Sequence, residues 1–268
     1  MSALALSLQT EPVHAQQQLR VTIENLSPTD GFFLTPLWFG LHDGGFDLFN
    51  GGEAASAALE LIAEDGVIDD MDGTDGNDLF SLFAGPGRVQ GVVTDPAGFG
   101  SVGMQPPLID AGNTASATID IMNASAYQYF SYASMVIPSN DAFIGNGNPT
   151  AVQVFDAAGN FLAPGPIVLT WADIYDAGTE VNNGAGAAFS AEDFMPAIET
   201  DEGGTVGLHP GLSLFEGTAT PAGTIGGGTD PVAFSVPFAR ITIEQIPEPG
   251  TLVLSGLGAV GLLSRRRR

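Results

Sequence analysis

The sequence predicts an all-β fold: an antiparallel sandwich of eight strands with one short helix, followed by a separate hydrophobic helix at the C-terminus. Three observations support this class. The 36 glycines and 18 prolines are spread along the 268 residues, so turns must recur at short intervals. Several runs alternate apolar and polar residues, which is the period of a half-buried strand. Because 44% of the residues are hydrophobic, we expect one domain with one large core over residues 16–246.

Alternation locates the strands. In residues 18–26, Leu19, Val21 and Ile23 alternate with polar residues. The longest alternating run, residues 234–246, is expected to pair with this first strand and so to bring the two ends of the domain together. The other strands are predicted at residues 35–41, 88–94, 117–122, 127–137, 151–156 and 167–171.

One segment has the pattern of a helix. Residues 53–65 contain helix formers with Leu59, Ile62 and Ala63 at helical spacing, and Gly66 follows as a stop. The acidic run beyond it, residues 69–78, fails the EF-hand pattern, because the position that needs glycine holds Asp75 when the loop is counted from Asp70. We interpret this run as a solvated loop, with a weak cation site as the alternative.

The charge distribution excludes several classes of partner. The chain has 31 acidic residues, seven arginines and no lysine, and four of the arginines are the last four residues. Residues 16–246 therefore carry a net charge of about −26, which repels nucleic acid and attracts divalent cations. Solubility alone is the simpler explanation for most of these acidic residues. Since there is no cysteine, disulfides, thiolate metal sites and a cysteine nucleophile are absent.

The C-terminal segment combines three features in order. Pro247, Glu248 and Pro249 precede an apolar run, residues 251–263, which four arginines follow, Arg265, Arg266, Arg267 and Arg268. If this run forms a helix, it spans about 22 Å, which is a marginal length for a transmembrane helix. The arginines favour a cytoplasmic C-terminus, which places the domain outside the inner membrane. The segment 247–268 resembles the PEP-CTERM sorting signal of Gram-negative bacteria. That resemblance implies export, processing by an exosortase and transient anchoring in the inner membrane; an unprocessed anchor is the alternative.

The first fifteen residues are expected to be a signal peptide. Residues 1–15 contain a short apolar stretch and end in Val13, His14 and Ala15, a sequence similar to a cleavage site. They lack the basic start of such peptides, so we expect the true start to lie upstream of Met1.

Two motifs suggest a calcium site. Asp141 lies in residues 138–145, and Asp176 and Glu180 lie in residues 173–180, each motif following a predicted strand. Carboxylates spaced around a glycine turn can converge on calcium, which takes six to eight oxygen ligands; the alternative is that they satisfy turn backbone.

These two motifs, with the opening residues 21–49, resemble the spondin N-type domain over residues 19–246. The resemblance implies a C2-like eight-stranded antiparallel sandwich that binds Ca²⁺ through Asp141, Asp176 and Glu180. Animal spondins have aspartate where this chain has Glu180, so this ligand departs from the family pattern.

The predicted function is a non-enzymatic, calcium-binding module of the cell surface or extracellular matrix that serves in adhesion, with matrix or exopolysaccharide as partner. The adhesion role follows from the resemblance alone. One alternative is an extracellular hydrolase that uses dispersed carboxylates on polysaccharide, and another is a structural surface protein without a ligand. His42 and His209 belong to no catalytic or zinc motif, so we expect each to lie in a turn or to pack partly buried.

Overall fold

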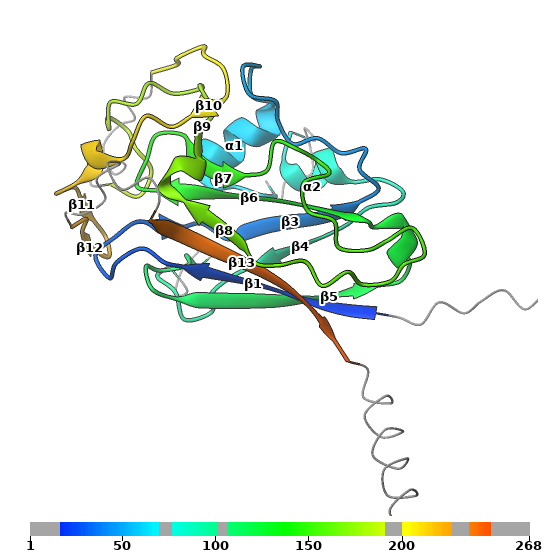
Figure 1. Ribbon diagram of the computed structural model, residues 1–268. Coiled ribbons are helices and arrows are strands. Elements are labelled where there is room, and N and C mark those ends of the chain that lie inside the picture. The colour runs from blue at the N-terminus through cyan, green and yellow to red at the C-terminus, as the bar shows by residue number, and fades with distance from the viewer. Residues whose placement is uncertain (1–16, 70–76, 101–106, 191–199, 227–235, 248–268) are drawn as a thin grey trace, which may run out of the picture.

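The domain is built in three layers (Figure 1). A four-stranded sheet packs against a seven-stranded sheet, and two helices cover the other face of the larger sheet. All strand pairs in these sheets are antiparallel, so the predicted antiparallel, mostly β class is confirmed. The structure is a computed structural model that describes residues 17–69, 77–100, 107–190, 200–226 and 236–247.

The smaller sheet joins the two ends of the domain. Its strands, in sheet order, are β5 (Thr114–Ile121), β1 (Gln17–Asn25), β13 (Pro237–Ile246) and β8 (Ile167–Thr170). Leu19, Val21 and Ile23 of β1 are fully buried, as their alternation predicts. The predicted pairing of the first and last strands is confirmed, because β1 and β13 are hydrogen-bonded from Gln18 opposite Ile246 to Asn25 opposite Ala239.

The larger sheet is assembled from long and very short strands. Its main path is β10 (Gly207–Leu208), β9 (Ile174–Asp176), β7 (Ala142–Gly145), β6 (Tyr129–Ile137), β3 (Leu37–His42) and β4 (Val89–Val93), and β2 (Phe33–Leu34) also pairs with β6. A separate hairpin is formed by β11 (Ala219–Thr220) and β12 (Gly223–Thr224). The predicted count of eight strands is not confirmed. The additional strands β2, β7, β9 and β10 have two to four residues, too few for alternation to reveal them.

One predicted strand, residues 151–156, is not a strand in the structure. This segment forms only isolated bridges within the described residues, between Gln153 and Tyr129 and between Phe155 and Phe161. The physical reason is the turn that follows it. Asp156 Oδ1 accepts hydrogen bonds from the backbone N–H groups of Ala158 (2.9 Å) and Asn160 (2.8 Å), so the chain reverses before a longer ladder can form.

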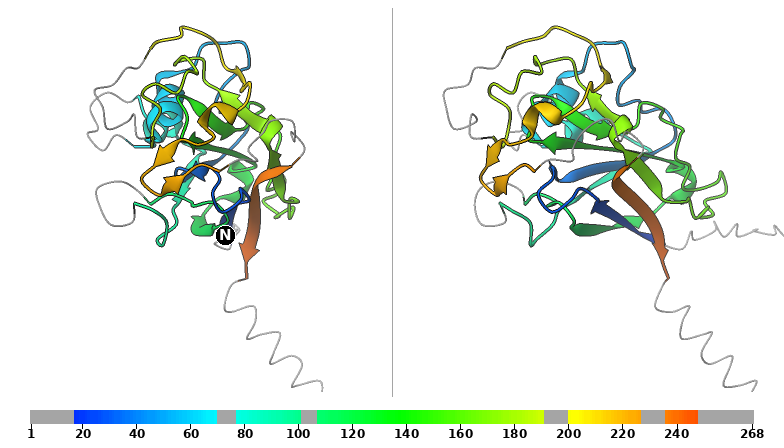
Figure 2. Two further views of the ribbon diagram at one scale, coloured as in Figure 1. Left: turned by 90° about the vertical axis from the view of Figure 1, so that its left-hand side faces the viewer. Right: turned by 60° about the vertical axis from the view of Figure 1, so that its left-hand side comes forward.

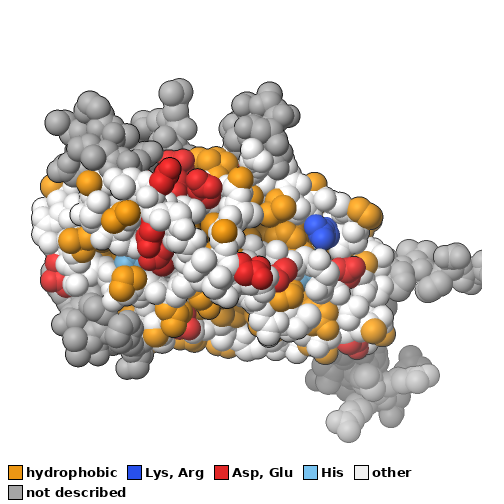
Figure 3. Space-filling view, turned by 90° about the horizontal axis from the view of Figure 1, so that it is seen from above, with side chains coloured by type: hydrophobic (Ala, Val, Ile, Leu, Met, Phe, Trp, Pro, Cys, Tyr) orange, Lys and Arg blue, Asp and Glu red, His pale blue; other side chains and the backbone are white. Residues whose placement is uncertain are grey.

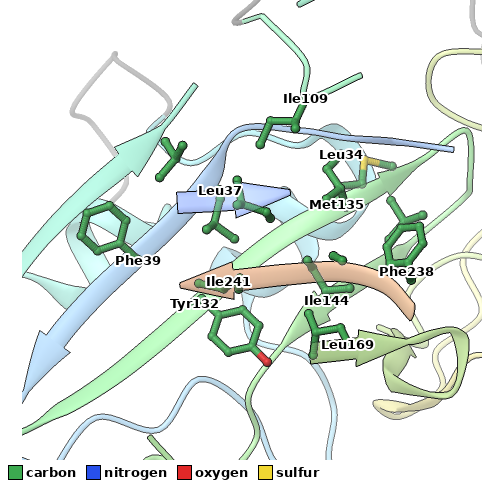
Figure 4. Packing of buried hydrophobic residues seen from close by; sticks show 14 of the residues in the cluster. Leu34, Leu37, Phe39, Ile109, Tyr132, Met135, Ile144, Leu169, Phe238 and Ile241 are labelled. Atoms are coloured by element: carbon green, nitrogen blue, oxygen red, sulfur yellow. The ribbon is translucent and has the colours of Figure 1, made fainter. Parts of the chain in front are cut away.

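The main core fills the space between the two sheets (Figure 4). Fully or almost fully buried apolar side chains from both sheets meet there, and burying each one contributes roughly 1.5–3 kcal/mol. The labelled members are Leu34, Leu37, Phe39, Ile109, Tyr132, Met135, Ile144, Leu169, Phe238 and Ile241. This packing fixes the larger sheet and so holds β7 and β9 in place.

Two helices form the third layer. The predicted helix near residues 53–65 is observed as α1 (Ala57–Asp65), shorter at its start because Ser56 caps it by accepting a hydrogen bond from the backbone N–H of Leu59 (3.2 Å). Gly66 ends it in the left-handed conformation, as predicted. The prediction of a single helix is wrong. A second, α2 (Leu79–Phe83), starts at Asp78, and 3-10 turns occur at Ala124–Ala126, Trp171–Asp173 and Ser213–Phe215.

The two ends of the described chain lie together, away from β7 and β9 (Figures 1 and 2). Gln17 Nε2 donates to the carbonyl of Gly159 (2.9 Å), and Gln245 Nε2 donates to Gln17 Oε1 (2.9 Å). We call this region, around Gln17, Ile121, Gly159 and Ile246, the tail end of the domain. The predicted signal peptide, residues 1–15, and the predicted C-terminal helix lie outside the described residues.

Candidate functional site

The two motifs singled out in the sequence lie side by side. Strand β7 pairs with β9 so that Ala142 is opposite Asp176 and Phe143 is opposite Tyr175. Asp141 immediately precedes β7, and Asp176 is the last residue of β9. The motifs therefore meet as neighbouring strands of the larger sheet, at the opposite end of the domain from the tail end (Figure 1).

Asp141 is fully buried, and its two carboxylate oxygens have different environments. Oδ2 accepts hydrogen bonds from the backbone N–H of Thr179 (2.9 Å), from Thr179 Oγ1 (3.3 Å) and from the backbone N–H of Glu180 (3.2 Å). Oδ1 is buried and accepts no hydrogen bond. Leaving a buried charged oxygen without a partner is costly, so this oxygen marks a position where a proton or a cation would be stabilised.

Asp176 is held by a chain of side chains that ends at a histidine. Its Oδ1 accepts from the backbone N–H of Gly178 (2.7 Å), and its Oδ2 accepts from Asn182 Nδ2 (2.5 Å). Asn182 Oδ1 lies 2.9 Å from His209 Nε2. Because His209 Nδ1 accepts the backbone N–H of Gly211 (3.0 Å), the ring proton of a neutral His209 is on Nε2 and is donated to Asn182.

The carboxyl groups of Asp141 and Asp176 lie within hydrogen-bonding distance of each other. Burial raises the pKa of Asp141, and the nearby charge of Asp176 raises it further. Burial also raises the pKa of Asp176, with the charge of Glu202 adding to the effect, while the hydrogen bond from Gly178 opposes it. Two such carboxylates repel each other unless a proton or a cation lies between them.

A third carboxylate approaches from α1. Glu64 forms a hydrogen bond with Thr179, which also donates to Asp141. Burial raises the pKa of Glu64 to about 7, and the charges of Glu60, Asp65 and Asp141 contribute to the increase. Glu64 is not among the site residues predicted from the sequence, because nothing in a helical pattern indicates that the last turn of α1 will lie over two motifs far along the chain. We call Glu64, Asp141, Asp176, Thr179, Asn182 and His209 the carboxylate site.

Glu180, the third predicted ligand, contacts the site through its backbone. Its N–H donates to Asp141, its side chain is mostly buried, and it forms an isolated bridge with Asp201. In the described part of the chain, no three Asp, Glu or His side chains are arranged to hold a metal ion by themselves. Calcium ligands other than carboxylates, such as hydroxyl, amide and carbonyl oxygens, would therefore have to complete a coordination shell.

His42 and His209 are more completely buried than the predicted turn or partly buried positions. His42 is fully buried, with Nε2 3.0 Å from Ser131 Oγ and Nδ1 accepting the backbone N–H of Gly44 (3.0 Å). Burial lowers the pKa of His42 to about 4, and burial likewise lowers that of His209 to about 4. Both are therefore neutral at pH 7.

The surface over the helices is acidic. Figure 3 shows groups of Asp and Glu side chains across this face, with few basic side chains between them. Of the acidic loop at residues 69–78, residues 70–76 lie outside the described part. Asp78, at its end, caps α2 by accepting from the backbone N–H of Ser81 (2.7 Å), so this carboxylate has a structural role.

Comparison with protein families identifies the C-terminal segment. Residues 245–268 match the model of the PEP-CTERM protein-sorting motif, which contains the predicted Pro247 to Pro249 and Arg265 to Arg268. This match shares only residues 245 and 246 with the region of the spondin resemblance, residues 19–246, and so does not support that resemblance. No curated protein matches the sequence. Within the described residues no helix is long and apolar enough to span a membrane; the apolar run at residues 251–263 lies outside them. The chain thus carries a PEP-CTERM sorting signal, which implies export through an exosortase-type system to the cell surface or the extracellular space.

Proposed function

We propose that this protein is an exported, non-enzymatic calcium-binding module of the spondin type that acts in adhesion at the cell surface or in the extracellular matrix. The observation that carries the calcium part is the buried Oδ1 of Asp141, which has no hydrogen-bond partner, in a carboxyl group that lies within hydrogen-bonding distance of the carboxyl group of Asp176. A divalent cation would satisfy that oxygen and neutralise both carboxylates.

The donor set suits a hard cation. Asp141 and Asp176 supply carboxylate oxygens, and Thr179 brings a hydroxyl oxygen to the same loop. Asn182 turns its amide nitrogen to Asp176, so its amide would have to rotate before its oxygen could join the ligand set. Glu180 stays in the proposed ligand set with Asp141 and Asp176, because its backbone N–H already contacts Asp141. Calcium accepts such mixed oxygen ligands in flexible geometry.

The geometry favours cation binding over polysaccharide hydrolysis. The acid and base of a glycosidase are separated by roughly 5 Å or more, so that the sugar or a water fits between them. Asp141 and Asp176 lie within hydrogen-bonding distance, and Asp141 has no exposed surface. A cation can reach such a carboxylate when its loop opens locally, whereas a polysaccharide chain would need a permanent cleft.

The location of the protein supports an adhesive role. The sorting signal implies a surface or extracellular destination. The proposed partner there is the extracellular matrix or an exopolysaccharide. In this proposal residues 251–263 anchor the chain in the inner membrane until an exosortase acts near Pro247 to Pro249, and Arg265 to Arg268 remain in the cytoplasm. The choice of matrix as partner rests on the spondin resemblance.

Thermal unfolding of the full chain with and without calcium tests the proposal. Wild type should melt several degrees higher in calcium than in chelator, since a ligand at ~100 times its Kd adds about 2.7 kcal/mol. Asp176→Asn should lose most of this difference. Asp120→Asn is the matched control, because it removes the same charge from an exposed position at the tail end. An equal calcium response in the two variants, or none in wild type, would reject the calcium site.

A further inference from the structure

The strands of the smaller sheet continue almost to the sorting signal. Ile246 is the last residue of β13 and is paired with Gln18, so the folded domain ends one residue before Pro247. The apolar run begins at Thr251. Five Cα-to-Cα steps separate Ile246 from Thr251, and fully extended they span at most about 18 Å. The interfacial layer of a bilayer occupies roughly 5–8 Å of that distance.

The tail end presents apolar side chains to solvent. Met122 follows Ile121, which pairs with Gln17, and its side chain is 65% exposed. Leu162 lies three residues beyond Gly159, the residue that accepts the hydrogen bond from Gln17, and is 46% exposed. Single exposed apolar residues are common, but these two lie on the end of the domain that a short tether must bring close to the bilayer.

The charges at this end indicate which lipid surface it can approach. Asp120 accepts a hydrogen bond from Gln18 Nε2 (3.0 Å), and Glu244 lies opposite Arg20 in the β1–β13 register. Asp156, in the loop before Gly159, is partly exposed. The end therefore carries more acidic than basic groups, so anionic headgroups would repel it, whereas a zwitterionic phospholipid surface would not.

We propose that, while the C-terminal segment is membrane-embedded, the tail end of the domain rests on a zwitterionic phospholipid surface through Met122 and Leu162 and the carboxylate site faces away from the membrane. The inference rests on the membrane anchoring in the proposed function. Strand β13 runs from the far end of the domain to the tail end, and its ten residues span about 30 Å (Figure 2). The carboxylate site is therefore presented outward, toward a partner in the matrix.

The absence of cysteine makes the orientation measurable. Asn123→Cys and Leu208→Cys each create one labelling position in the full chain. Both native residues are exposed, they lie at opposite ends of the domain, and Met122 and Leu162 stay in place. Each variant is labelled with a fluorophore and incorporated into phosphatidylcholine nanodiscs that contain lipids brominated near the headgroup. We expect at least a several-fold stronger quenching of the label at position 123 than of the label at position 208.

A variant with twelve Gly and Ser residues inserted between Ile246 and Pro247 serves as a control, because the longer tether should remove most of that difference. Equal quenching at the two positions in chains that co-elute with nanodiscs would overturn the orientation but leave the anchoring intact. Failure of the full chain to co-elute with nanodiscs would overturn the anchoring and the orientation together. Neither outcome bears on the calcium site, which the melting experiment with and without calcium tests separately.

Discussion

Replacing Asp141 by asparagine should stabilise the protein when no calcium is present. The substitution keeps an oxygen that can accept the hydrogen bonds from Thr179 and Glu180, and it places an NH₂ group where the unpartnered Oδ1 now lies. That group can donate to Asp176, which lies within hydrogen-bonding distance. The change thus removes a buried charge and supplies a missing donor.

The magnitude follows from the bond gained. A hydrogen bond to a charged group contributes about 2 kcal/mol to the free energy of unfolding. For a domain of this size, 2 kcal/mol corresponds to an increase in Tm of roughly 4–8 °C. In excess calcium the order should reverse, because wild type gains the binding free energy and Asp141→Asn does not.

The advantage of Asp141→Asn should depend on pH in a defined direction. In wild type, burial raises the folded-state pKa of Asp141 above the ordinary value of 3.8. The protonated carboxyl group therefore makes its full contribution to the free energy of unfolding below pH 3.8, and this contribution is lost as the pH rises through the folded-state pKa. Asparagine has no such loss. The Tm difference in chelator should therefore be small in acid and should grow toward pH 7.

Differential scanning calorimetry of wild type and Asp141→Asn in chelator, from pH 4 to pH 7, checks both the sign and the trend. Asp120→Asn should change Tm little throughout, since its carboxylate is exposed. If Asp141→Asn melts below wild type at pH 7 in chelator, then Oδ1 is already satisfied in solution and the reasoning about the carboxylate site is wrong.

Three further outcomes are expected. In urea denaturation, Gly178→Ala should lower the free energy of unfolding by at least about 2 kcal/mol, because the Cβ of the new alanine would lie 2.5 Å from the backbone nitrogen of Thr205 and φ at this position is +70°. Gly217→Ala is the control. Its φ is +81° and no atom lies within 4 Å of the new Cβ, so it should cost only about 1 kcal/mol. His42 has a folded-state pKa of about 4 against an ordinary value of 6.5, so protonation favours the unfolded state. As the pH falls from 7 to 5, this residue should lower the free energy of unfolding of wild type by about 2 kcal/mol. His42→Gln should lack this part of the pH dependence, and the same dependence of unfolding free energy on pH in both proteins would contradict the prediction. Mass spectrometry of the protein from the cell surface should find a chain that ends near Pro247 to Pro249, and recovery of intact Arg265 to Arg268 would contradict processing.

The sequence allowed prediction of the features that follow from local patterns. Alternation in β1 and β13 identified both strands and their pairing, and the glycine after α1 identified its end. The short strands β7 and β9 carry no such pattern. Their position depends on the core between the sheets, so their direct pairing, rather than a meeting of loops, could be seen only in the structure.

The carboxylate site was predictable only in part, because some of its residues lie in local motifs and others join the site through tertiary packing. Asp141 and Asp176 stand out because they are acidic residues in turn-forming motifs. Glu64 becomes part of the site because α1 packs on the larger sheet. The apolar residues of α1 predict which face of the helix is buried, but they do not predict which strands that face packs against. Asn182 and His209 are joined by a hydrogen bond across 27 residues, a contact that local sequence cannot indicate.

Calorimetric titration of calcium into the metal-free full chain tests the central claim most directly. We predict saturable binding of calcium in wild type, loss of binding at the carboxylate site in both Asp141→Asn and Asp176→Asn, and unchanged binding in Asp120→Asn. Absence of binding in wild type, or the same isotherm in all four proteins, would contradict the claim that Asp141 and Asp176 hold the cation.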